Sequence, residues 1–317
     1  MKVFRDLEAV GSLPSPVIAI GNFDGVHIGH QKIIETVTAR AREIGGTSIL
    51  MTFDPHPLTI LRPAGRPPQI LPMSEKIRML GTLGLDMMLI VPFTREFASI
   101  TAESFIEDIL SRRLRAREVF VGTNFHFGRG GVGDFDLLRT EGERHGIEAR
   151  RVPVVLYDDQ PVSSTRIREN ISRGAVDRAA AMLGREYAIR GLVVHGRGRG
   201  AGLGFSTANL STDNELIPAL GVYVTRVEVG GERHVSVTNI GERPTFGEGE
   251  RVVETHLLDY AGPELYGRTM RLAFCAHLRA ERKFESGQAL ATQIKKDVAA
   301  ARAWFRGRAG SDGGVLG

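Results

Sequence analysis

The sequence contains little cysteine and no long apolar run. Its 317 residues include one cysteine, Cys275, so no disulfide can form within the chain, and no group of cysteines and histidines has the spacing of a structural zinc site. Residues 1–16 lack the apolar core of a secretion signal, and no segment approaches the ~18 apolar residues of a membrane-spanning helix. These absences predict a cytoplasmic protein with no membrane partner.

Acidic and basic residues are nearly balanced. The chain has 41 lysines and arginines and 37 aspartates and glutamates, which gives a net charge of +4. A small positive excess suits anionic small-molecule substrates, and we expect no nucleic-acid partner. The length is sufficient for two domains, each with its own hydrophobic core.

The first half of the chain alternates short apolar runs with helical patterns. This alternation is typical of an α/β fold with a doubly wound parallel sheet, whose ligands gather at the carboxyl ends of the strands. The expected strands are 17–20, 47–53, 86–91, 118–122 and 150–155, and the expected helices are 27–43, 74–83, 102–113 and 135–145. The loop 62–72 contains four prolines and is interpreted as a semi-rigid flap, with a plain linker as the alternative.

The second half has the pattern of successive strands separated by glycines. After an expected helix at 175–183, the strand candidates are 187–195, 205–210, 221–229, 233–240, 252–259 and 269–277. This spacing predicts a small six-stranded antiparallel β-barrel, covered by a C-terminal amphipathic helix at 286–305. We therefore expect an α/β domain at 1–184, a barrel domain at 185–305 and a disordered Gly-rich tail at 306–317.

The motif GNFDGVHIGH at residues 21–30 directly follows the expected strand 17–20. Gly21 and Gly25 permit a tight turn, and a helix that begins near Val26 directs its free N–H groups and positive dipole end toward that turn, which attracts phosphate. His27 and His30 share one face of such a helix, where two imidazoles can stabilise charge on a reacting phosphoryl group.

Other interpretations of this motif stay open at this point. A helix start with two surface histidines explains the same residues. A zinc site is disfavoured, because Asp24 is the one nearby third ligand and helical zinc pairs more often use positions i and i+4. The motif is not a Walker A loop, because no Gly-Lys-Ser/Thr follows the glycines. Gly29 has no side chain and leaves the backbone open to a ligand.

Three other segments carry candidate chemistry. In residues 163–168, SSTRIR, hydroxyls can cap a helix while arginines bind phosphate, although a plain cap needs one hydroxyl. Thr207 and Asn209 follow a glycine-dense loop and lie two apart, so on a strand their oxygens share a side and suit Mg²⁺. An Arg-Gly loop that binds RNA is the alternative there. Glu254 lies in a strand-like run, where a solvated carboxylate is the default.

Taken together, the motifs resemble one family. His27 to His30 match the HxGH signature of nucleotidyltransferases, and with GNFDG in front of it the segment resembles the bacterial bifunctional riboflavin kinase and FMN adenylyltransferase, or FAD synthetase. Residues 162–168 resemble the ISSTxIR motif of that family, with valine in first position. Residues 239–246, 254–259 and 278–284 resemble its NxGxRPTF, ExHLLD and LRxExKF segments, so the resemblance extends from Val17 to about Phe305.

This resemblance implies riboflavin, FMN and ATP as substrates, FAD as product and Mg²⁺ as cofactor. It implies that Glu254 is the general base of the kinase and that His27 and His30 engage the ATP phosphates. The implied ATP-binding residues are Gly21, Asn22, Phe23, Asp24, Gly25, Gly29, Ser163, Ser164, Thr165, Arg168, Gly196, Gly198 and Gly204. The implied flavin-binding residues are Phe53, Asn124, Phe125, Phe127 and Arg279, and the implied metal ligands are Thr207 and Asn209. The alternative for the three phenylalanines is a place in the hydrophobic core.

Two departures from the family pattern affect the kinase loop. Ser206 precedes Thr207 where the family has proline, and Ala201 stands where it has a basic residue. The sequence therefore predicts riboflavin phosphorylation to FMN followed by adenylylation to FAD, with two alternatives. One is a monofunctional adenylyltransferase with a degenerate barrel, and the other is a nucleic-acid-binding protein that uses the Arg-Gly loop.

Overall fold

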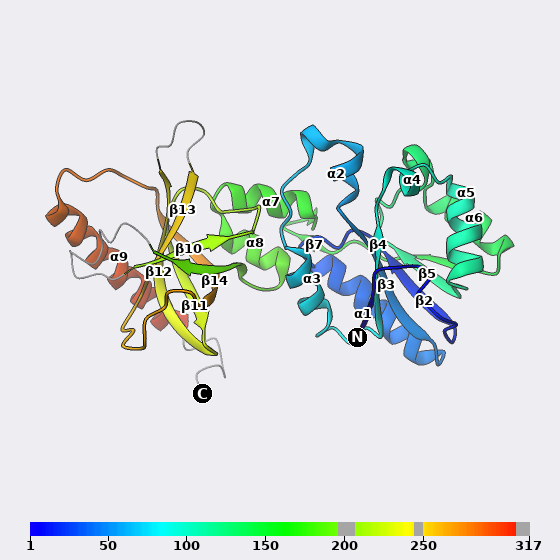
Figure 1. Ribbon diagram of the computed structural model, residues 1–317, viewed down its shortest axis with the longest axis horizontal. Helices are drawn as coiled ribbons and strands as arrows, with labels where there is room; N and C mark the ends of the chain where they lie inside the picture. Colours follow the sequence, from blue (N-terminus) through cyan, green and yellow to red (C-terminus); the bar gives the residue numbers. More distant parts are fainter. Residues whose placement is uncertain (196–206, 244–249, 309–317) are drawn as a thin grey trace. The chain divides into compact units, whose positions relative to one another are not determined.

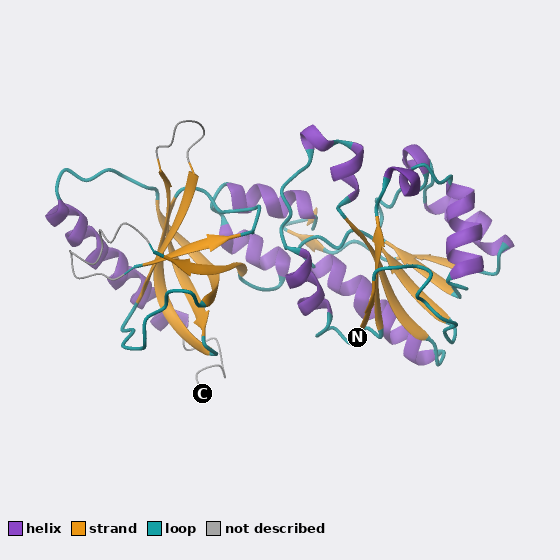
Figure 2. Ribbon diagram, in the orientation of Figure 1, coloured by secondary structure: helices purple, strands orange, loops and turns teal. Residues whose placement is uncertain are grey.

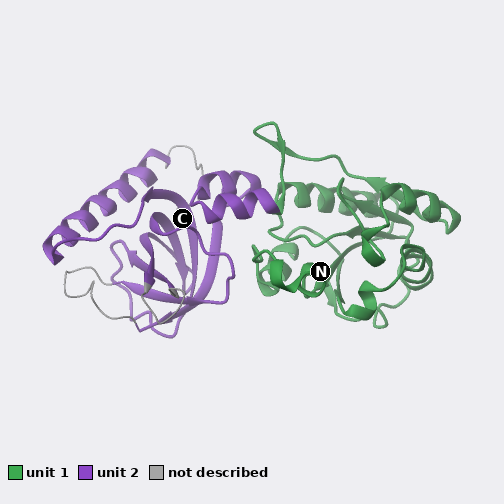
Figure 3. Ribbon diagram, turned by 90° about the horizontal axis from the view of Figure 1, so that it is seen from above, with its two compact units in different colours: residues 1–164 green, residues 165–317 purple. Residues whose placement is uncertain are grey.

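The computed structural model describes residues 1–195, 207–243 and 250–308. The chain forms two compact units, Met1–Ser164 and Thr165–Gly317 (Figure 3). Each unit has its own sheet, as Figure 2 shows. In the part of the chain that the structure describes, no helix is both long enough and apolar enough to cross a membrane.

The first unit is built around a six-stranded parallel sheet (Figure 1). Its strands are β1 (Lys2–Phe4), β2 (Pro16–Ile20), β3 (Thr47–Asp54), β4 (Met87–Pro92), β5 (Glu118–Val121) and β6 (Glu148–Arg151). The order across the sheet is β1-β4-β3-β2-β5-β6. The chain adds β3 and β4 on one side of β2, then β5 and β6 on the other, so β2 and β5 flank the topological switch point. This confirms the predicted doubly wound sheet.

Helices cover this sheet because its central strands are apolar on both faces. All five residues of β2 are buried. Ile18 and Ile20 pack in a core with side chains of α5, η2 and α6, whereas α1 contacts β2 and β3. The helices and short strands of the unit are α1 (Ile28–Glu43), α2 (Pro57–Leu61), η1 (Pro63–Gly65), α3 (Met73–Leu80), α4 (Arg95–Ala98), α5 (Ala102–Ser104), η2 (Phe105–Arg113), η3 (Arg129–Gly131), α6 (Phe135–Arg144), β7 (Leu156–Tyr157) and β8 (Gln160–Pro161).

Several expected boundaries in the first half were wrong. The first helix begins at Ile28 rather than near Val26, because His27 has extended backbone angles and acts as the N-cap. The expected strand 150–155 is instead β6 at Glu148–Arg151. The expected helix 102–113 has the predicted bounds, but it is one helical turn followed by a π-helical segment. The short strand β1 was not predicted, and the proline-rich loop contains the single turn η1.

The second unit is a closed antiparallel barrel, as predicted. Its elements are α7 (Ser164–Ser172, which begins at the unit boundary), α8 (Val176–Leu183), β9 (Tyr187–Val194), β10 (Ala208–Thr212), β11 (Gly221–Val229), β12 (Glu232–Arg243), β13 (Glu250–Leu257), β14 (Thr269–Arg279) and α9 (Gly287–Arg308). The strands close in the order β10-β13-β12-β11-β14-β9. Strand β10 begins at Ala208, later than expected, so Thr207 lies just before it.

The two faces of the barrel wall are chemically different. Val222 and Val224 of β11 pack outward against Ala301 of α9. On the inner face, Thr225 shares hydrogen bonds of 2.7 Å with Ser236 and Thr238. These inward hydroxyls satisfy one another, so the interior can hold polar groups without an unpaired donor.

An ion pair fastens the C-terminal helix to the barrel. The Arg279 Nη2 atom of β14 lies 2.8 Å from Asp297 Oδ2 of α9, and Gln293 Nε2 donates to Asp297 Oδ1 at 2.7 Å. Asp297 is buried, with an exposed fraction of 6%. Helix α9 continues to Arg308, so the first residues of the expected tail 306–317 are helical, and residues 309–317 lie outside the described part of the chain.

Replacing the buried carboxylate should loosen this attachment. We expect Asp297→Asn to lower the free energy of unfolding by about 2 kcal/mol, because a charge-assisted contact is lost while the shape is kept. Denaturant unfolding can be followed by the fluorescence of Trp304, the single tryptophan, which lies in α9. The exposed Lys296→Gln on the same helix is the control and should change stability by less than about 0.5 kcal/mol. Equal stability of the two variants would contradict the prediction.

Candidate active sites

The loop after β2 carries an unusual backbone. Phe23 has a φ of +48° and Val26 a φ of +43°, and both side chains are buried. Gly25 has a φ of +83°, and a Cβ there would lie 3.0 Å from Ile70 Cδ1. The loop therefore needs glycine at position 25, and it holds two other residues in the left-handed region that they rarely adopt.

Buried donors bind this loop from the sheet and from α3. The Asn22 carbonyl accepts hydrogen bonds from Thr52 Oγ1 at 3.1 Å and from Lys76 Nζ at 2.9 Å. Lys76 has an exposed fraction of 4%. Burial lowers the pKa of the Lys76 ammonium, and the Asp24 and Asp54 carboxylates act in the opposite direction. Sequence reasoning missed Lys76 and Thr52.

Asp24 joins three segments that the sequence analysis singled out. Its carboxylate, 2% exposed, accepts the backbone N–H of Ile70 at 3.1 Å and that of Leu71 at 3.3 Å. Its backbone carbonyl accepts the Ser164 hydroxyl at 2.8 Å. The GNFDG loop, the proline-rich flap and the start of the SSTRIR segment are thus brought together, and the Asp24 carboxylate binds backbone groups of this chain.

The two histidines lie together at the start of α1. His27 Nδ1 accepts the His30 N–H at 3.2 Å, and the two rings stack with centroids 3.5 Å apart. A Cβ at Gly29 would lie 3.1 Å from His27 Nδ1, so glycine makes room for the His27 ring. Phe23 packs edge-on against His30 with centroids 5.1 Å apart. The paired imidazoles therefore lie at the positive end of the α1 dipole.

Phenylalanines form a continuous cluster near the carboxyl ends of the strands. Phe125 stacks on Phe127 at 5.3 Å between centroids, and Phe127 contacts Phe105 at 5.4 Å. Phe97 links Phe105 to Phe53, at 6.4 Å and 5.9 Å between centroids. The three predicted phenylalanines thus belong to one cluster, to which the structure adds Phe93, Phe97 and Phe105. The predicted Asn124 is exposed in the adjoining loop.

The remaining predicted residues of the first site lie in α7 or directly before it, and His56 lies at the start of α2. His56, which was not among the predicted residues, caps α2, since its Nδ1 accepts the Leu58 N–H at 3.2 Å. Ser163 lies directly before α7, and Thr165 and Arg168 lie on α7 beyond the boundary between the two units. Thr165 is exposed and Arg168 is half-buried.

The barrel brings Glu254 beside two asparagines. In the strand register, Glu254 of β13 pairs with Asn209 of β10 on one side and with Asn239 of β12 on the other. Directly paired residues project from the same face of a sheet, and here that face is the outer one, because the neighbouring Thr255 joins the inner hydroxyl network. Asn209 is buried, with an exposed fraction of 6%. Sequence spacing did not reveal Asn239 as a neighbour of Glu254.

A second carboxylate lies near the same face. A Cβ at Gly241 would lie 2.6 Å from Glu281 Oε1 and 3.3 Å from Asn239 Nδ2, so glycine leaves space for both groups. The predicted Gly196, Gly198 and Gly204, together with the departures Ala201 and Ser206, lie outside the described residues. Arg279, predicted to bind flavin, forms the ion pair with Asp297 and lies over the Phe284 ring at 5.8 Å.

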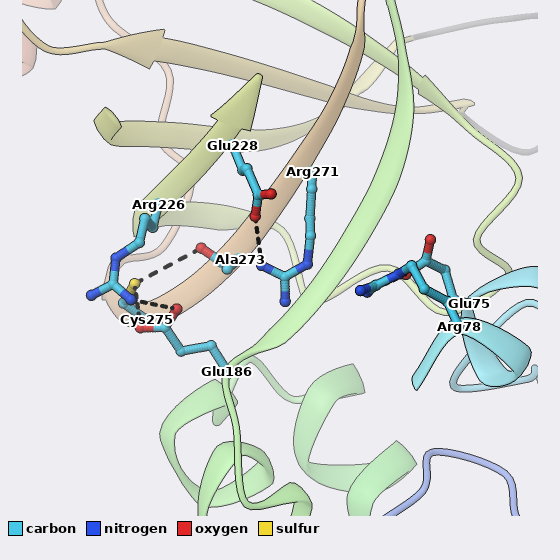
Figure 4. Close-up of polar contacts among 8 residues, drawn as sticks. All are labelled: Glu75, Arg78, Glu186, Arg226, Glu228, Arg271, Ala273 and Cys275. Atoms are coloured by element: carbon cyan, nitrogen blue, oxygen red, sulfur yellow. Dashed lines mark hydrogen bonds and ion pairs between the residues drawn. The ribbon is translucent and has the colours of Figure 1, made fainter. Parts of the chain in front are cut away.

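The second unit also contains a cavity of about 390 Å³ that none of the predicted site residues lines. Its lining includes Arg173, Cys275, His277, Trp304 and Arg308. The Cys275 thiol donates to Glu186 Oε1 at 3.2 Å, and Glu186 pairs with Arg226 (Figure 4). Burial, followed by the nearby Glu186 carboxylate, raises the pKa of the Cys275 thiol well above its usual range. Cys275 therefore keeps its proton, and a protonated thiol is a weak nucleophile.

Comparisons with known proteins match two different families to the two parts of the chain. The family model described as FAD synthetase matches residues 11–166, and the one described as riboflavin kinase matches residues 183–305. A crystal structure described as a macrolide-efflux protein from Streptococcus pneumoniae is 31% identical, covers 95% of this chain and 98% of its own, and has a TM-score of 0.88. The whole chain thus has the fold of a known structure.

Curated relatives share nearly the full length. A bifunctional riboflavin kinase/FMN adenylyltransferase from Pseudomonas fluorescens is 39% identical and covers 90% of this chain and 92% of its own. The relatives of that name from Escherichia coli K12 and Bacillus subtilis are 36% and 35% identical and cover 96% and 91% of this chain, 98% and 92% of their own. The chain belongs to the bifunctional riboflavin kinase/FMN adenylyltransferase family.

Proposed function

We propose that this protein phosphorylates riboflavin to FMN and then adenylylates FMN to FAD. The observation that carries the proposal is the match of both family models, in order, to the two halves of the chain. We assign adenylyl transfer to residues 1–184 and phosphoryl transfer to residues 185–305, in the cytoplasm, where the single cysteine stays reduced. Family membership gives no support to the nucleic-acid alternative.

In adenylyl transfer, the FMN phosphate attacks the α-phosphorus of ATP. A bond forms between an FMN phosphate oxygen and that phosphorus, and the bond to the β-phosphate breaks, so pyrophosphate leaves with the electron pair. His27 and His30 stabilise the charge that develops on the phosphates. The His27 Nδ1 atom accepts the His30 N–H, so the neutral His27 ring carries its proton on Nε2 and can donate it in a hydrogen bond.

In phosphoryl transfer, Glu254 accepts the proton of the ribityl 5′-hydroxyl while that oxygen attacks the γ-phosphorus of ATP. The bond from the γ-phosphorus to the β-phosphate oxygen breaks, and ADP leaves. The register of Glu254 beside Asn209 supports this role, because it places the base next to a proposed metal ligand.

Thr207 and Asn209 are proposed to hold Mg²⁺. The hydroxyl and amide oxygens of these residues fit a hard cation, and the Glu254 carboxylate lies across from Asn209. Among the described residues no group of three histidine, cysteine or acidic side chains is placed to hold a metal ion. When bound, Mg²⁺ neutralises charge on the phosphates.

Loss of either imidazole should strongly reduce adenylyl transfer and leave riboflavin phosphorylation unchanged. We expect His27→Asn and His30→Ala to reduce FAD formation from FMN by at least about 100-fold, because imidazole donors no longer contact the phosphates. Asparagine at position 27 retains a side chain suited to capping α1. Time courses of riboflavin, FMN and FAD separated by chromatography measure both activities. Exposed His145→Ala is the control, and full FAD formation by the histidine variants would refute the assignment.

The kinase should depend on Glu254 in the same selective way. We expect Glu254→Gln to slow FMN formation from riboflavin by about 100-fold or more, since the amide cannot accept the hydroxyl proton. Adenylylation of added FMN should be unchanged. Glu228→Gln in the same barrel, whose carboxylate lies 4.0 Å from Arg271 (Figure 4), is the matched control. Normal phosphorylation by Glu254→Gln would remove Glu254 from the mechanism.

A further inference from the structure

The peptide unit between Asn22 and Phe23 is fixed by two buried donors. Thr52 Oγ1 and Lys76 Nζ both donate to the Asn22 carbonyl oxygen, at 3.1 Å and 2.9 Å. Their exposed fractions are 0% and 4%. A carbonyl oxygen has two lone pairs, so both are engaged by side chains of the scaffold beneath the loop.

This anchoring determines the direction of the next N–H group. The Asn22–Phe23 bond is trans, and in a trans peptide the C=O and N–H bonds point in opposite directions. The Phe23 N–H therefore points away from Thr52 and Lys76. Among the described residues it has no hydrogen-bond partner, whereas the Gly21 N–H donates to the Met51 carbonyl at 3.1 Å. The donor is thus left for an acceptor other than the described residues.

Burial of the Lys76 ammonium is unfavourable if the side chain serves only a structural contact. Removing an ammonium group from water costs free energy that an apolar side chain of similar length does not cost. Burial accordingly lowers the pKa of Lys76. Within the part of the chain that the structure describes, the Asn22 carbonyl is the one hydrogen-bond acceptor that Lys76 contacts. The lysine is therefore directed at a single atom of the phosphate-binding loop.

We propose that Lys76 is a positioning residue for adenylyl transfer: together with Thr52 it holds the Asn22 carbonyl so that the Phe23 N–H donates to a phosphate oxygen of ATP. The inference rests on the proposed function of the first unit. It assigns no contact between Lys76 and ATP, because the ammonium acts through the peptide unit that it fixes.

Steady-state adenylylation of FMN, with ATP varied, tests the proposal. We expect Lys76→Met to lower kcat/KM for ATP about tenfold or more, mainly by raising the KM for ATP, while the KM for FMN stays near its wild-type value. Thr52→Val should act in the same direction, and Thr52→Ser, which keeps the hydroxyl, should restore the wild-type value. Because both donors act on one oxygen, the effects in the double variant should not be additive.

Controls separate positioning from general damage to the fold. Arg78→Gln changes an exposed residue of the same helix and removes the ion pair with Glu75 (Figure 4), and it should leave the KM for ATP unchanged. Riboflavin phosphorylation by each preparation serves as a measure of intact protein. An unchanged KM for ATP in Lys76→Met, or equal losses in both activities, would overturn the inference.

Amide hydrogen exchange provides a readout that does not depend on turnover. Saturating ATP should slow exchange at Phe23 in the wild type, and this protection should be reduced in Lys76→Met. If the wild type made no FAD from FMN, the proposed function would fail, and the exchange measurement would still decide on Lys76. Equal protection of Phe23 in wild type and variant would refute its positioning role.

Discussion

The parallel pairing of β2 with β3 on one side and β5 on the other is the constraint on which the first site depends. It places the loops after β2, β3 and β5 at the same edge of the sheet, where the chain changes direction. The motif at residues 21–30, the segment 54–57 and the loop 122–128 all leave from that edge. Polar motifs far apart in the sequence thus converge because one strand, buried on both faces, has neighbours from both halves of the sheet.

Two buried charges of opposite sign stabilise the loop at this edge. The Asp24 carboxylate accepts backbone N–H groups of the flap, and the Lys76 ammonium donates to a loop carbonyl. Left-handed backbone at Phe23 and Val26 costs about 1–3 kcal/mol at each residue, and such contacts offset that cost. The rigidity of the loop at residues 21–25 therefore comes partly from the side chain of Asp24, a residue that the motif predicts to bind ATP.

Periodicity and glycine spacing predicted the sheet and the barrel because both features are local. The burial of Lys76 cannot be predicted from local sequence. A lysine in an amphipathic helical pattern is expected to face solvent, whereas in the structure Lys76 is buried because it packs against the loop after β2. Likewise, the spacing of Thr207 and Asn209 in the sequence does not reveal that Glu254 lies beside Asn209, because that proximity is set by the register between β10 and β13. Strand β1 has three residues, too few for a periodic pattern to identify.

The order of the two reactions follows from the chemistry of the nucleophile rather than from the order of the units. Adenylyl transfer needs a phosphate oxygen as its acceptor, and riboflavin has none until its 5′-hydroxyl has been phosphorylated. The barrel must therefore act first, although it lies second in the chain. Glu254 and the two histidines, to which we assign the two reactions, belong to different units, so either set can be replaced without altering the other.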